Sequence, residues 1–353
     1  MVRLRPAGVL VSWMMKEIHQ QPAVLARTLG RETARARKLA RALARRDVRL
    51  VVLAARGSSD NAALFGRYLI EIATGIPVSL AAPSVHTLYR ARIRLRDALV
   101  VGVSQSGEST DVNRVVAECR RGGALAVGIT NEPDSALARI ADETFLVRAG
   151  QERSVAATKT YVGQLLVFYL LAAALQGRSS WPGLERVPDL AERALRLSPR
   201  IATLVERYRF MDRCVVVGRG LNYANAYELA IKLMETCYVV ADRFSTADLL
   251  HGPLAMVEKG FPVLAFAPPG RAFPDTSGVL RRLRAIGADT VVISDARALL
   301  AKATSPIPMP RMPELLSPIP YAVPGQLFSA HLSEVKGLSP DAPRSLAKVT
   351  RTL

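Results

Sequence analysis

The sequence predicts an α/β protein with two tandem, doubly wound parallel sheets. Continuous apolar runs, each bounded by turn residues, alternate with amphipathic helical patterns along the chain. Strands of a parallel sheet are buried on both faces, so continuous apolar runs are typical of them. The order also occurs twice: runs begin at positions 49, 99 and 123, and matching runs begin at positions 213, 263 and 287. This repeat predicts two domains of one architecture.

The first half of the chain predicts strands that end in polar turns. Residues 49–57 form a strand that runs into Ser58 and Ser59, followed by a helix to Glu71. A second strand covers residues 98–103, and a third covers residues 123–131. Ligands of open α/β sheets bind beyond the carboxyl ends of the strands. We therefore expect the turns after the first two strands to face one crevice.

The second half repeats these elements. Residues 213–220 form a strand that precedes a helix to Glu235, with the helical pattern clearest over residues 227–239. The next strands cover residues 263–267 and 287–295. The predicted boundaries are a disordered extension (1–14), a first domain (15–185), a linker helix (186–205), a second domain (206–340) and a C-terminal tail (341–353).

The composition excludes several classes of protein. The net charge is +18, but the arginines that carry most of it are scattered, apart from one cluster over residues 31–49 that is interpreted as a solvated helix face. No basic strand interleaved with aromatic residues appears, so nucleic-acid binding is not expected. The longest apolar stretch, residues 165–175, is too short to span a bilayer and is interpreted as a buried helix that needs a partner subunit to cover it. Three cysteines lie far apart, with neither metal-ligand spacing nor a disulfide framework. A cytoplasmic protein without a signal peptide or a metal is expected.

The turn after the second strand predicts a phosphate site. The strand of residues 98–103 is followed at once by Ser104-Gln105-Ser106-Gly107-Glu108-Ser109 and then by a helical pattern. A helix N-terminus offers free N–H groups and a partial positive charge, to which the hydroxyl groups add donors. An ordinary helix cap is the alternative interpretation. The corresponding turn of the second half reads Pro268-Pro269-Gly270 and lacks these hydroxyl groups.

Titratable side chains gather in the second half, which suggests that it supplies acid–base chemistry. Glu228, Lys232 and Glu235 share one face of the predicted helix. Apolar neighbours of Glu235 would raise the pKa of its carboxyl and suit it to proton transfer, although a surface ion-pair ladder is the alternative. His251 precedes Gly-Pro and is therefore held on a turn. Lys348 is one of few lysines in an arginine-rich chain, which hints at a need for an amine that can lose its proton.

Six segments of the chain together resemble those of a known protein family. The segments RGSSDN, SQSGEST, SVAATKTY, GRGLNYANAYELAIKLMET, LLHGPLAMVE and RSLAKVT occur in this order. They resemble the double sugar isomerase (SIS) domain proteins, over roughly residues 15–353. The set is similar to the isomerase half of glucosamine-6-phosphate synthase, and the first half is closer still to SIS-type glucosamine-6-phosphate deaminases.

The resemblance implies roles for individual residues. Glu235 matches the base that moves a proton between carbons 1 and 2, and His251 matches a ring-opening residue supplied across a dimer interface. Lys348 matches a lysine of the C-terminal tail that enters the active site and has been linked to ring opening or a Schiff base. The remaining matches concern the sugar phosphate and its surroundings: Ser59, Ser104, Gln105, Ser106 and Ser109 hold the phosphate, Val155 and Ala157 contact the sugar, and Glu228 and Lys232 support the site.

The same resemblance implies an enzyme without a cofactor and a homodimer with composite active sites. Glucosamine 6-phosphate deaminase activity with linked aldose–ketose isomerisation is the expected function. Ser109 replaces a threonine of the synthase, and Ala157 replaces a serine, so the sugar preference stays open. The synthase also carries a glutaminase domain with an N-terminal cysteine nucleophile. The first cysteine here is Cys119, so we expect no glutaminase activity.

Two alternatives stay open. One is an isomerase or ammonia-dependent synthase that acts on another phosphosugar. The other is a non-catalytic phosphosugar-binding regulator, because SIS domains also serve in such proteins. Regulators of this kind usually carry a helix-turn-helix module, and the residues before Leu50 are too few and too rich in Ala and Arg to form a convincing one.

Overall fold

A computed structural model describes residues 11–348 of the chain. Two five-stranded parallel sheets form its framework. The first has the order β2-β1-β3-β4-β5 and the second the order β7-β6-β8-β9-β10. Strands of the first sheet are β1 (Leu50–Ala54), β2 (Val78–Leu80), β3 (Ala98–Val103), β4 (Leu125–Thr130) and β5 (Glu143–Leu146). Those of the second are β6 (Arg213–Gly218), β7 (Val240–Ser245), β8 (Pro262–Phe266), β9 (Asp289–Ser294) and β10 (Ser305–Pro308).

The two sheets are equivalent in register as well as in order, which confirms the predicted fold class. Val51 pairs with Leu99 between β1 and β3, and Val215 pairs with Val263 between β6 and β8. These two pairs occupy matching places in the internal repeat. β3 is buried along its whole length, as expected of a strand with helices on both faces.

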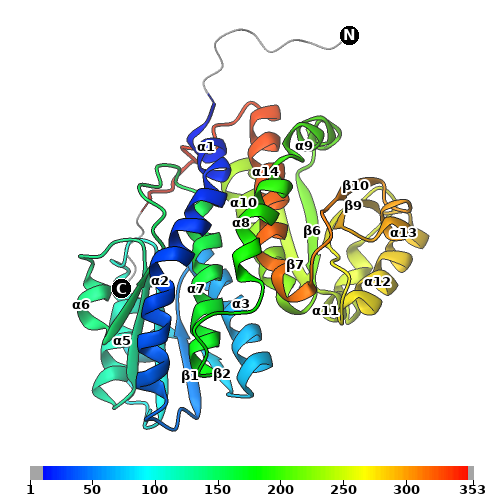
Figure 1. The fold of residues 1–353 in the computed structure, drawn as a ribbon. Coiled ribbons are helices and arrows are strands. Elements are labelled where there is room, and N and C mark those ends of the chain that lie inside the picture. The colour runs from blue at the N-terminus through cyan, green and yellow to red at the C-terminus, as the bar shows by residue number, and fades with distance from the viewer. Residues whose placement is uncertain (1–10, 349–353) are drawn as a thin grey trace.

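Helices cover both sheets (Figure 1). The helices up to the end of the first unit are α1 (Trp13–His19), α2 (Gln21–Leu43), α3 (Ser58–Thr74), α4 (Pro83–Thr87), α5 (Thr110–Arg121), α6 (Ala136–Ile140) and α7 (Lys159–Leu175). Those that follow are α8 (Val187–Leu195), α9 (Ser198–Leu204), α10 (Tyr223–Cys237), α11 (Thr246–Leu250), α12 (Phe273–Ile286), α13 (Arg297–Leu300) and α14 (Pro318–Val335).

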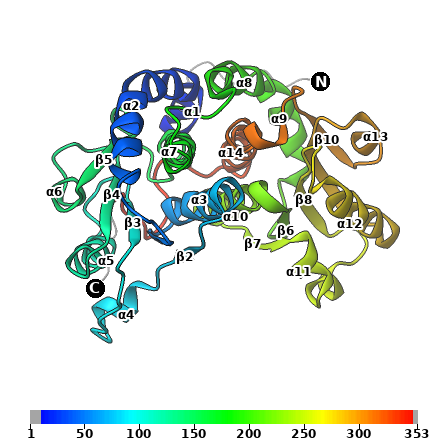
Figure 2. The same ribbon diagram turned by 60° about the horizontal axis from the view of Figure 1, so that its bottom comes forward.

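A layer of helices joins the two units. Figure 2 shows α3 beside α10 and α7 beside α14 between the sheets, and these helices contact one another. The apolar segment 165–175, which we expected to need a partner subunit to cover it, forms most of α7. Its side chains are buried apart from the terminal Leu175, against α2, α3 and α14 of the same chain. This expectation was therefore wrong, because helices of the same chain cover the segment: α2 and α3 of the first unit, together with α14 of the second.

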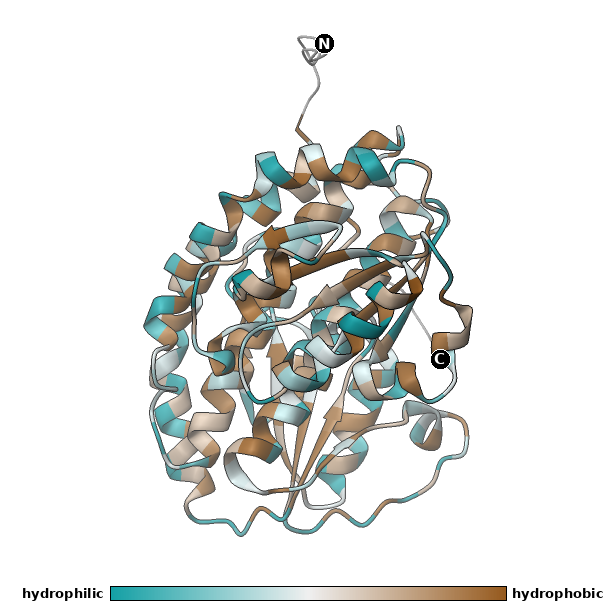
Figure 3. Cartoon of the chain, turned by 90° about the vertical axis from the view of Figure 1, so that its right-hand side faces the viewer, coloured by the Kyte–Doolittle hydropathy of each residue, from teal (hydrophilic) through white to brown (hydrophobic). Residues whose placement is uncertain are grey.

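The outer helices are amphipathic. In α2 the side chains of Val24, Leu25, Ala36 and Leu39 are buried, whereas the arginines of the helix lie toward solvent. Figure 3 shows the same contrast, with hydrophobic strands inside and hydrophilic patches on the outer helices. The arginine cluster of this segment thus forms a solvated helix face.

The N-terminal helix begins earlier than the predicted disordered extension (1–14) allows. Ser12 caps α1 by accepting a hydrogen bond from the Met15 amide. The amides of Trp13 and Met14 donate to the carboxylate of Asp341, at 2.7 and 2.8 Å. Residues 11–14 are thus held by a contact with the far end of the chain, which no local pattern could indicate. Residues 1–10 of the predicted extension lie outside the described residues.

Candidate functional site

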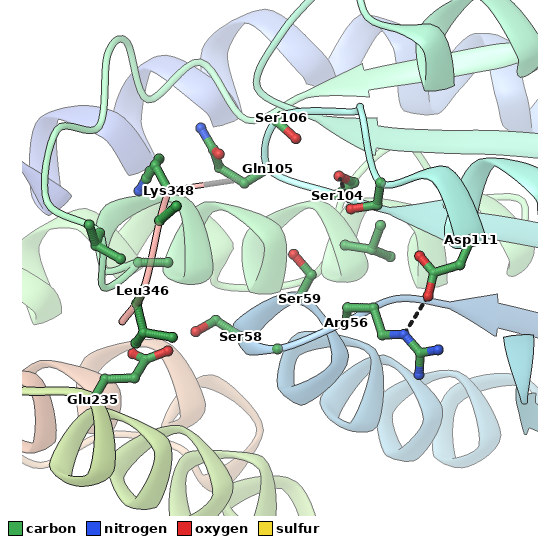
Figure 4. Close-up of a pocket in the computed structure, with 16 residues that line it drawn as sticks. Arg56, Ser58, Ser59, Ser104, Gln105, Ser106, Asp111, Glu235, Leu346 and Lys348 are labelled. Atoms are coloured by element: carbon green, nitrogen blue, oxygen red, sulfur yellow. Dashed lines mark hydrogen bonds and ion pairs between the residues drawn. The ribbon is translucent and has the colours of Figure 1, made fainter. Parts of the chain in front are cut away.

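One cavity of about 330 Å³ lies at the carboxyl ends of β1 and β3. Its volume is in the range of small-ligand sites. α10 and the C-terminal segment border it on the side away from the strands, as Figure 4 shows. The lining includes many of the residues singled out from the sequence: Ser59, Ser104, Gln105, Ser106, Ser109, Val155, Ala157, Glu235 and Lys348.

The serine hydroxyl groups around this cavity are held by fixed donors. The Gly107 amide donates to Ser104 Oγ at 3.0 Å, and the Glu108 amide donates to Ser106 Oγ at 3.2 Å. A hydroxyl oxygen that accepts from a rigid N–H keeps its own proton free to donate elsewhere. Ser106 can therefore direct its O–H group toward an anion in the cavity. Ser104 Oγ also lies 3.1 Å from Ser109 Oγ, so one of these two hydroxyl groups donates to the other.

Gly107 lets the loop make this turn. Its φ is +68°, in the left-handed region that favours glycine. A Cβ atom here would come within 2.1 Å of Ser135 Oγ and 2.9 Å of Thr130 Oγ1. The loop therefore packs closely on the segment after β4, which holds the three serines of residues 104–109 in place.

The carboxyl group of Glu235 faces the cavity from α10. Lys232 Nζ lies 2.5 Å from Glu235 Oε2 and 3.7 Å from Glu228 Oε1. Glu228 and Lys232 are buried, whereas the Glu235 side chain keeps 21% of its exposure. The predicted apolar setting thus belongs to Glu228 rather than to Glu235, which is charge-paired and accessible. The three side chains form a row of charges along α10, in which Glu228 and Lys232 are buried and Glu235 reaches the cavity.

Burial raises the pKa of Glu228 to about 7, against the opposing effect of Lys232 and of a hydrogen bond from Asn61. Asn61 Nδ2 donates to Glu228 Oε2 at 2.9 Å, and Ser58 Oγ donates to Oε1 at 3.1 Å. Both donors come from α3 of the first unit. Glu228 therefore links the two units directly beneath the cavity.

The C-terminal segment brings Lys348 into the lining. Lys348 Nζ donates to Glu152 Oε2 at 2.8 Å and to the Ser154 carbonyl at 2.7 Å. Burial favours the neutral form of Glu152, but the Lys348 ammonium and hydrogen bonds from Thr158 and Thr160 hold its pKa below the usual range. Lys348 is thus bound as a cation to an ionised carboxylate.

Further contacts fix the path of the segment to Lys348. Besides the bonds from α1 to Asp341, the Arg344 amide donates to Tyr238 Oη at 2.9 Å. The Arg344 guanidinium stacks on the Tyr238 ring, 3.7 Å from its centroid, a favourable cation–π contact. Tyr238 ends α10 in a left-handed conformation. The part of the predicted tail beyond Lys348 lies outside the described residues.

His251 does not line the cavity. It follows α11, its side chain is exposed, and Gly252 after it has a φ of +133°. Exposed apolar side chains are found in the same part of the sequence, at Met234, Val240, Leu250 and Met256. Within one chain, the structure brings together the predicted phosphate loop, Glu235 and Lys348, but leaves His251 apart from them.

Sequence reasoning missed several residues that border or support the cavity. Arg56 lines it after β1, and its Nε donates to Asp111 Oδ2 at 2.6 Å, shown as a dashed line in Figure 4. Asp111 is buried in the first turn of α5, so the pair connects the two loops of the predicted phosphate site. Glu152, which supports Lys348, is a further missed residue. It lies just before the segment SVAATKT, but no periodic pattern in the sequence distinguishes it.

In the second unit, the loop that corresponds to the serine loop of residues 104–109 binds a side chain of the protein itself. The amides of Arg271 and Ala272 donate to the Glu314 carboxylate, at 2.7 and 3.3 Å. Gly270 lies so close that a Cβ atom there would come within 2.2 Å of this carboxylate. An internal side chain thus takes up these backbone donors, which agrees with the asymmetry expected from the sequence.

The described residues contain neither a cluster of metal ligands nor a membrane-spanning helix. No group of three or more His, Cys, Asp or Glu side chains in residues 11–348 is placed to hold a metal ion. Over the same residues, no helix is both long and apolar enough to cross a membrane.

Comparisons with known proteins agree with the division into two units. The SIS domain model matches residues 43–174 and 210–333. The isomerising glutamine–fructose-6-phosphate aminotransferase of Pyrococcus horikoshii is 36% identical over 343 residues, which cover 95% of this chain and 57% of that protein. The relative from Gloeobacter violaceus, with the same name, is 36% identical over 353 residues and 58% of its length. The chain therefore spans less than two thirds of these curated relatives.

Solved structures show the same fold. The C-terminal domain of glucosamine-fructose-6-phosphate aminotransferase from Francisella tularensis has a TM-score of 0.85 at 27% identity, with 95% of this chain and 99% of that chain covered. Glucosamine-6-phosphate deaminase from Thermotoga maritima has a TM-score of 0.75 at 22% identity, with 97% and 100% covered, a likeness that concerns the fold alone. The predicted tandem architecture and the predicted class of enzyme agree with these comparisons.

Proposed function

Because the chain belongs to the SIS domain family, we propose that it is a phosphosugar isomerase that acts on an amino sugar. The proposed reaction converts glucosamine 6-phosphate and water to fructose 6-phosphate and ammonia. One observation carries the proposal: the serine loop and the Glu235 carboxyl border a single cavity of about 330 Å³. A candidate anion site and a candidate proton-transfer group thus lie within the reach of one small ligand.

The serine loop would hold the phosphate. Its hydroxyl groups line the cavity, and the start of α5 follows at Thr110. Hydroxyl donors and a helix N-terminus suit a phosphate group. Gln105 and Ser59 add donors at the rim. Anchoring one end of the sugar fixes carbons 1 and 2 against α10, and such positioning supplies a large part of the rate of many enzymes.

Glu235 would move the proton. In the open-chain sugar, its carboxylate takes the proton from carbon 2 and returns it to carbon 1. Carbon 2 is then left as an imine, which water hydrolyses to the ketone with release of ammonia. Lys232 Nζ, 2.5 Å from Glu235 Oε2, holds this carboxylate in position on α10. This proton shift requires a base, a ring-opening acid and an anchored phosphate, and therefore no cofactor.

Lys348 would act as a cation at the sugar end of the cavity. Its ammonium group already donates to Glu152 and to the Ser154 carbonyl, so a third N–H is left to donate to an oxygen of the substrate.

A different phosphosugar is the second candidate. Ala157 places a methyl group on the cavity wall, where a hydroxyl side chain would have added a hydrogen bond to the sugar. This favours no particular substituent on carbon 2. A panel of sugar phosphates run in both directions, with and without ammonia, separates a deaminase from a simple isomerase and from an ammonia-dependent synthase.

We further propose a cytoplasmic homodimer whose partner subunit supplies His251, with no nucleic acid or membrane as a partner. The deciding experiment incubates the purified protein with glucosamine 6-phosphate and measures ammonia and fructose 6-phosphate, with Glu235→Gln as the control. Stoichiometric release of both products is expected. Absence of turnover above this control with every phosphosugar of the panel would favour a non-catalytic phosphosugar-binding protein instead.

A further inference from the structure

The buried amide of Gln164 lies directly behind the proposed phosphate site. Gln164 is on α7, and its side chain is 1% exposed. Its Nε2 donates to Ser59 Oγ at 2.9 Å. Ser59 lines the cavity beside the serine loop. The hydrogen bond therefore joins the core of the first unit to a residue of the site.

Burial of this amide lowers the stability of the folded protein. Between Tyr161 and the end of α7, the helix otherwise carries only apolar side chains and the hydroxyl of Tyr169. Gln164 Oε1 has no hydrogen-bond partner among residues 11–348. A buried polar atom without a partner costs about 1–3 kcal/mol. An apolar side chain of the same size would avoid that cost, so stability does not explain the glutamine.

The direction of the hydrogen bond suggests what the glutamine does. A side-chain amide N–H can only donate, so Ser59 Oγ accepts and its own proton is left to point elsewhere. Ser104 and Ser106 are held in the same way by backbone amides. Ser59 lies in the first turn of α3, and the Gln164 amide is the one side-chain donor recorded for its oxygen in the described part of the chain.

We propose that Gln164 is a positioning residue, which orients the Ser59 hydroxyl so that its proton faces the phosphate of the substrate. This inference rests on the proposed function, because it needs an anion in the cavity. Gln164 does not touch the cavity itself and acts only through Ser59.

The test compares Gln164→Met with Gln21→Met. Gln21 is a matched control: its side chain is fully buried, its Nε2 also donates to one side-chain oxygen, that of Gln326, and its Oε1 also lacks a partner. We expect Gln164→Met to raise KM for glucosamine 6-phosphate about tenfold, as the loss of a hydrogen bond to a charged group does, with kcat nearly unchanged and Tm unchanged or raised. Gln21→Met should leave KM unchanged.

A double-mutant cycle shows whether the effect passes through Ser59. Ser59→Ala should raise KM, and Gln164→Met should add nothing in that background. A further rise in KM there, or an unchanged KM in the single variant, would overturn the inference. If Gln164→Met does not fold, Gln164→Glu replaces it: an ionised carboxylate can only accept a hydrogen bond, so the Ser59 hydroxyl would donate to it instead of to the phosphate, and KM should rise more.

Binding of inorganic phosphate, measured by calorimetry, separates this inference from the proposed function. If wild type binds phosphate and Ser59→Ala weakens binding, the anion site stands, and the Gln164 variants then decide the inference alone. If phosphate does not bind, or if Ser59→Ala changes neither binding nor KM, the proposed phosphate site is wrong and the role of Gln164 falls with it.

Discussion

Lys348 Nζ lies 2.8 Å from Glu152 Oε2, and this ion pair holds the C-terminal segment against the cavity. The Glu152 side chain is fully buried, whereas the Lys348 side chain keeps 26% of its exposure. The carboxylate belongs to the rigid core, and the lysine belongs to a segment that arrives from the far end of the chain. Glu152 therefore determines where Lys348 can sit.

We predict that Glu152→Gln releases this segment. The neutral amide cannot hold the ammonium group as strongly, and breaking a buried pair costs about 3–5 kcal/mol. We expect kcat to fall at least tenfold, which would mean about 1.4 kcal/mol of lost transition-state stabilisation, and trypsin to cleave faster after Arg344.

Glu32→Gln is the control for that variant. Glu32 is equally buried and lies 2.8 Å from the Arg148 side chain, remote from the lining of the cavity. It should lose stability but keep kcat and the resistance to trypsin. Equal protection of Arg344 in wild type and Glu152→Gln would show that the ion pair does not hold the segment.

The second prediction concerns pH. Burial raises the pKa of Glu228 to about 7 in the folded protein, from about 4.3 in an unfolded chain. Between these values the folded state binds more protons than the unfolded state, so the free energy of unfolding falls as pH rises. We expect a loss of about 1–3 kcal/mol from this group between pH 4.5 and pH 7.

Glu228→Gln should remove that slope, because a glutamine does not titrate. Urea unfolding at several pH values from 4.5 to 8 measures it, and the advantage of the variant over wild type should grow with pH. Parallel curves for the two proteins would contradict the raised pKa of Glu228.

The fold could be predicted well from the sequence, because its signals are local. A strand such as β3 is buried on both faces, so its apolar run and the turn after it appear in consecutive residues. The serine loop follows directly, and the same alternation in the second half marks the repeat. Glu235 and its partners on α10 are also local, since helical spacing places them on one face.

Long-range contacts could not be predicted in this way. Glu152 receives its partner from 196 residues away, and Asp341 binds the start of α1 from 328 residues away. The burial of α7 depends on α2, α3 and α14, which come from distant parts of the sequence, so the segment alone could not show what covers it. Gln164 escaped notice because a single amide in an apolar helix has meaning only when Ser59 lies beside it.

The third prediction tests the loop geometry. Gly107→Ala forces a Cβ atom to within 2.1 Å of Ser135 Oγ at a φ of +68°, so the loop must move. We expect KM for the phosphosugar to rise at least tenfold and the free energy of unfolding to fall by about 2–4 kcal/mol, from steric overlap added to the backbone cost.

Gly177→Ala separates these two contributions. Gly177 has a φ of +73° with no atom within 4 Å of the added Cβ position, so only the backbone cost of about 1–2 kcal/mol applies. Its KM should equal that of wild type. Should Gly107→Ala behave like Gly177→Ala in both measurements, the close packing of the loop would be irrelevant to binding.

The last prediction concerns His251, which is exposed and lies outside the lining of the cavity. In the proposed dimer, each site combines Glu235 of one chain with His251 of the other. His251→Ala and Glu235→Gln proteins should then each be inactive. After subunit exchange, half of the dimers are hybrids, and each hybrid has one site with both groups and one with neither. Equal mixing should restore about a quarter of wild-type activity. If His251 served its own chain, every site in the mixture would lack one group and the mixture would stay inactive, which sedimentation and exchange of a labelled subunit would distinguish from failed mixing.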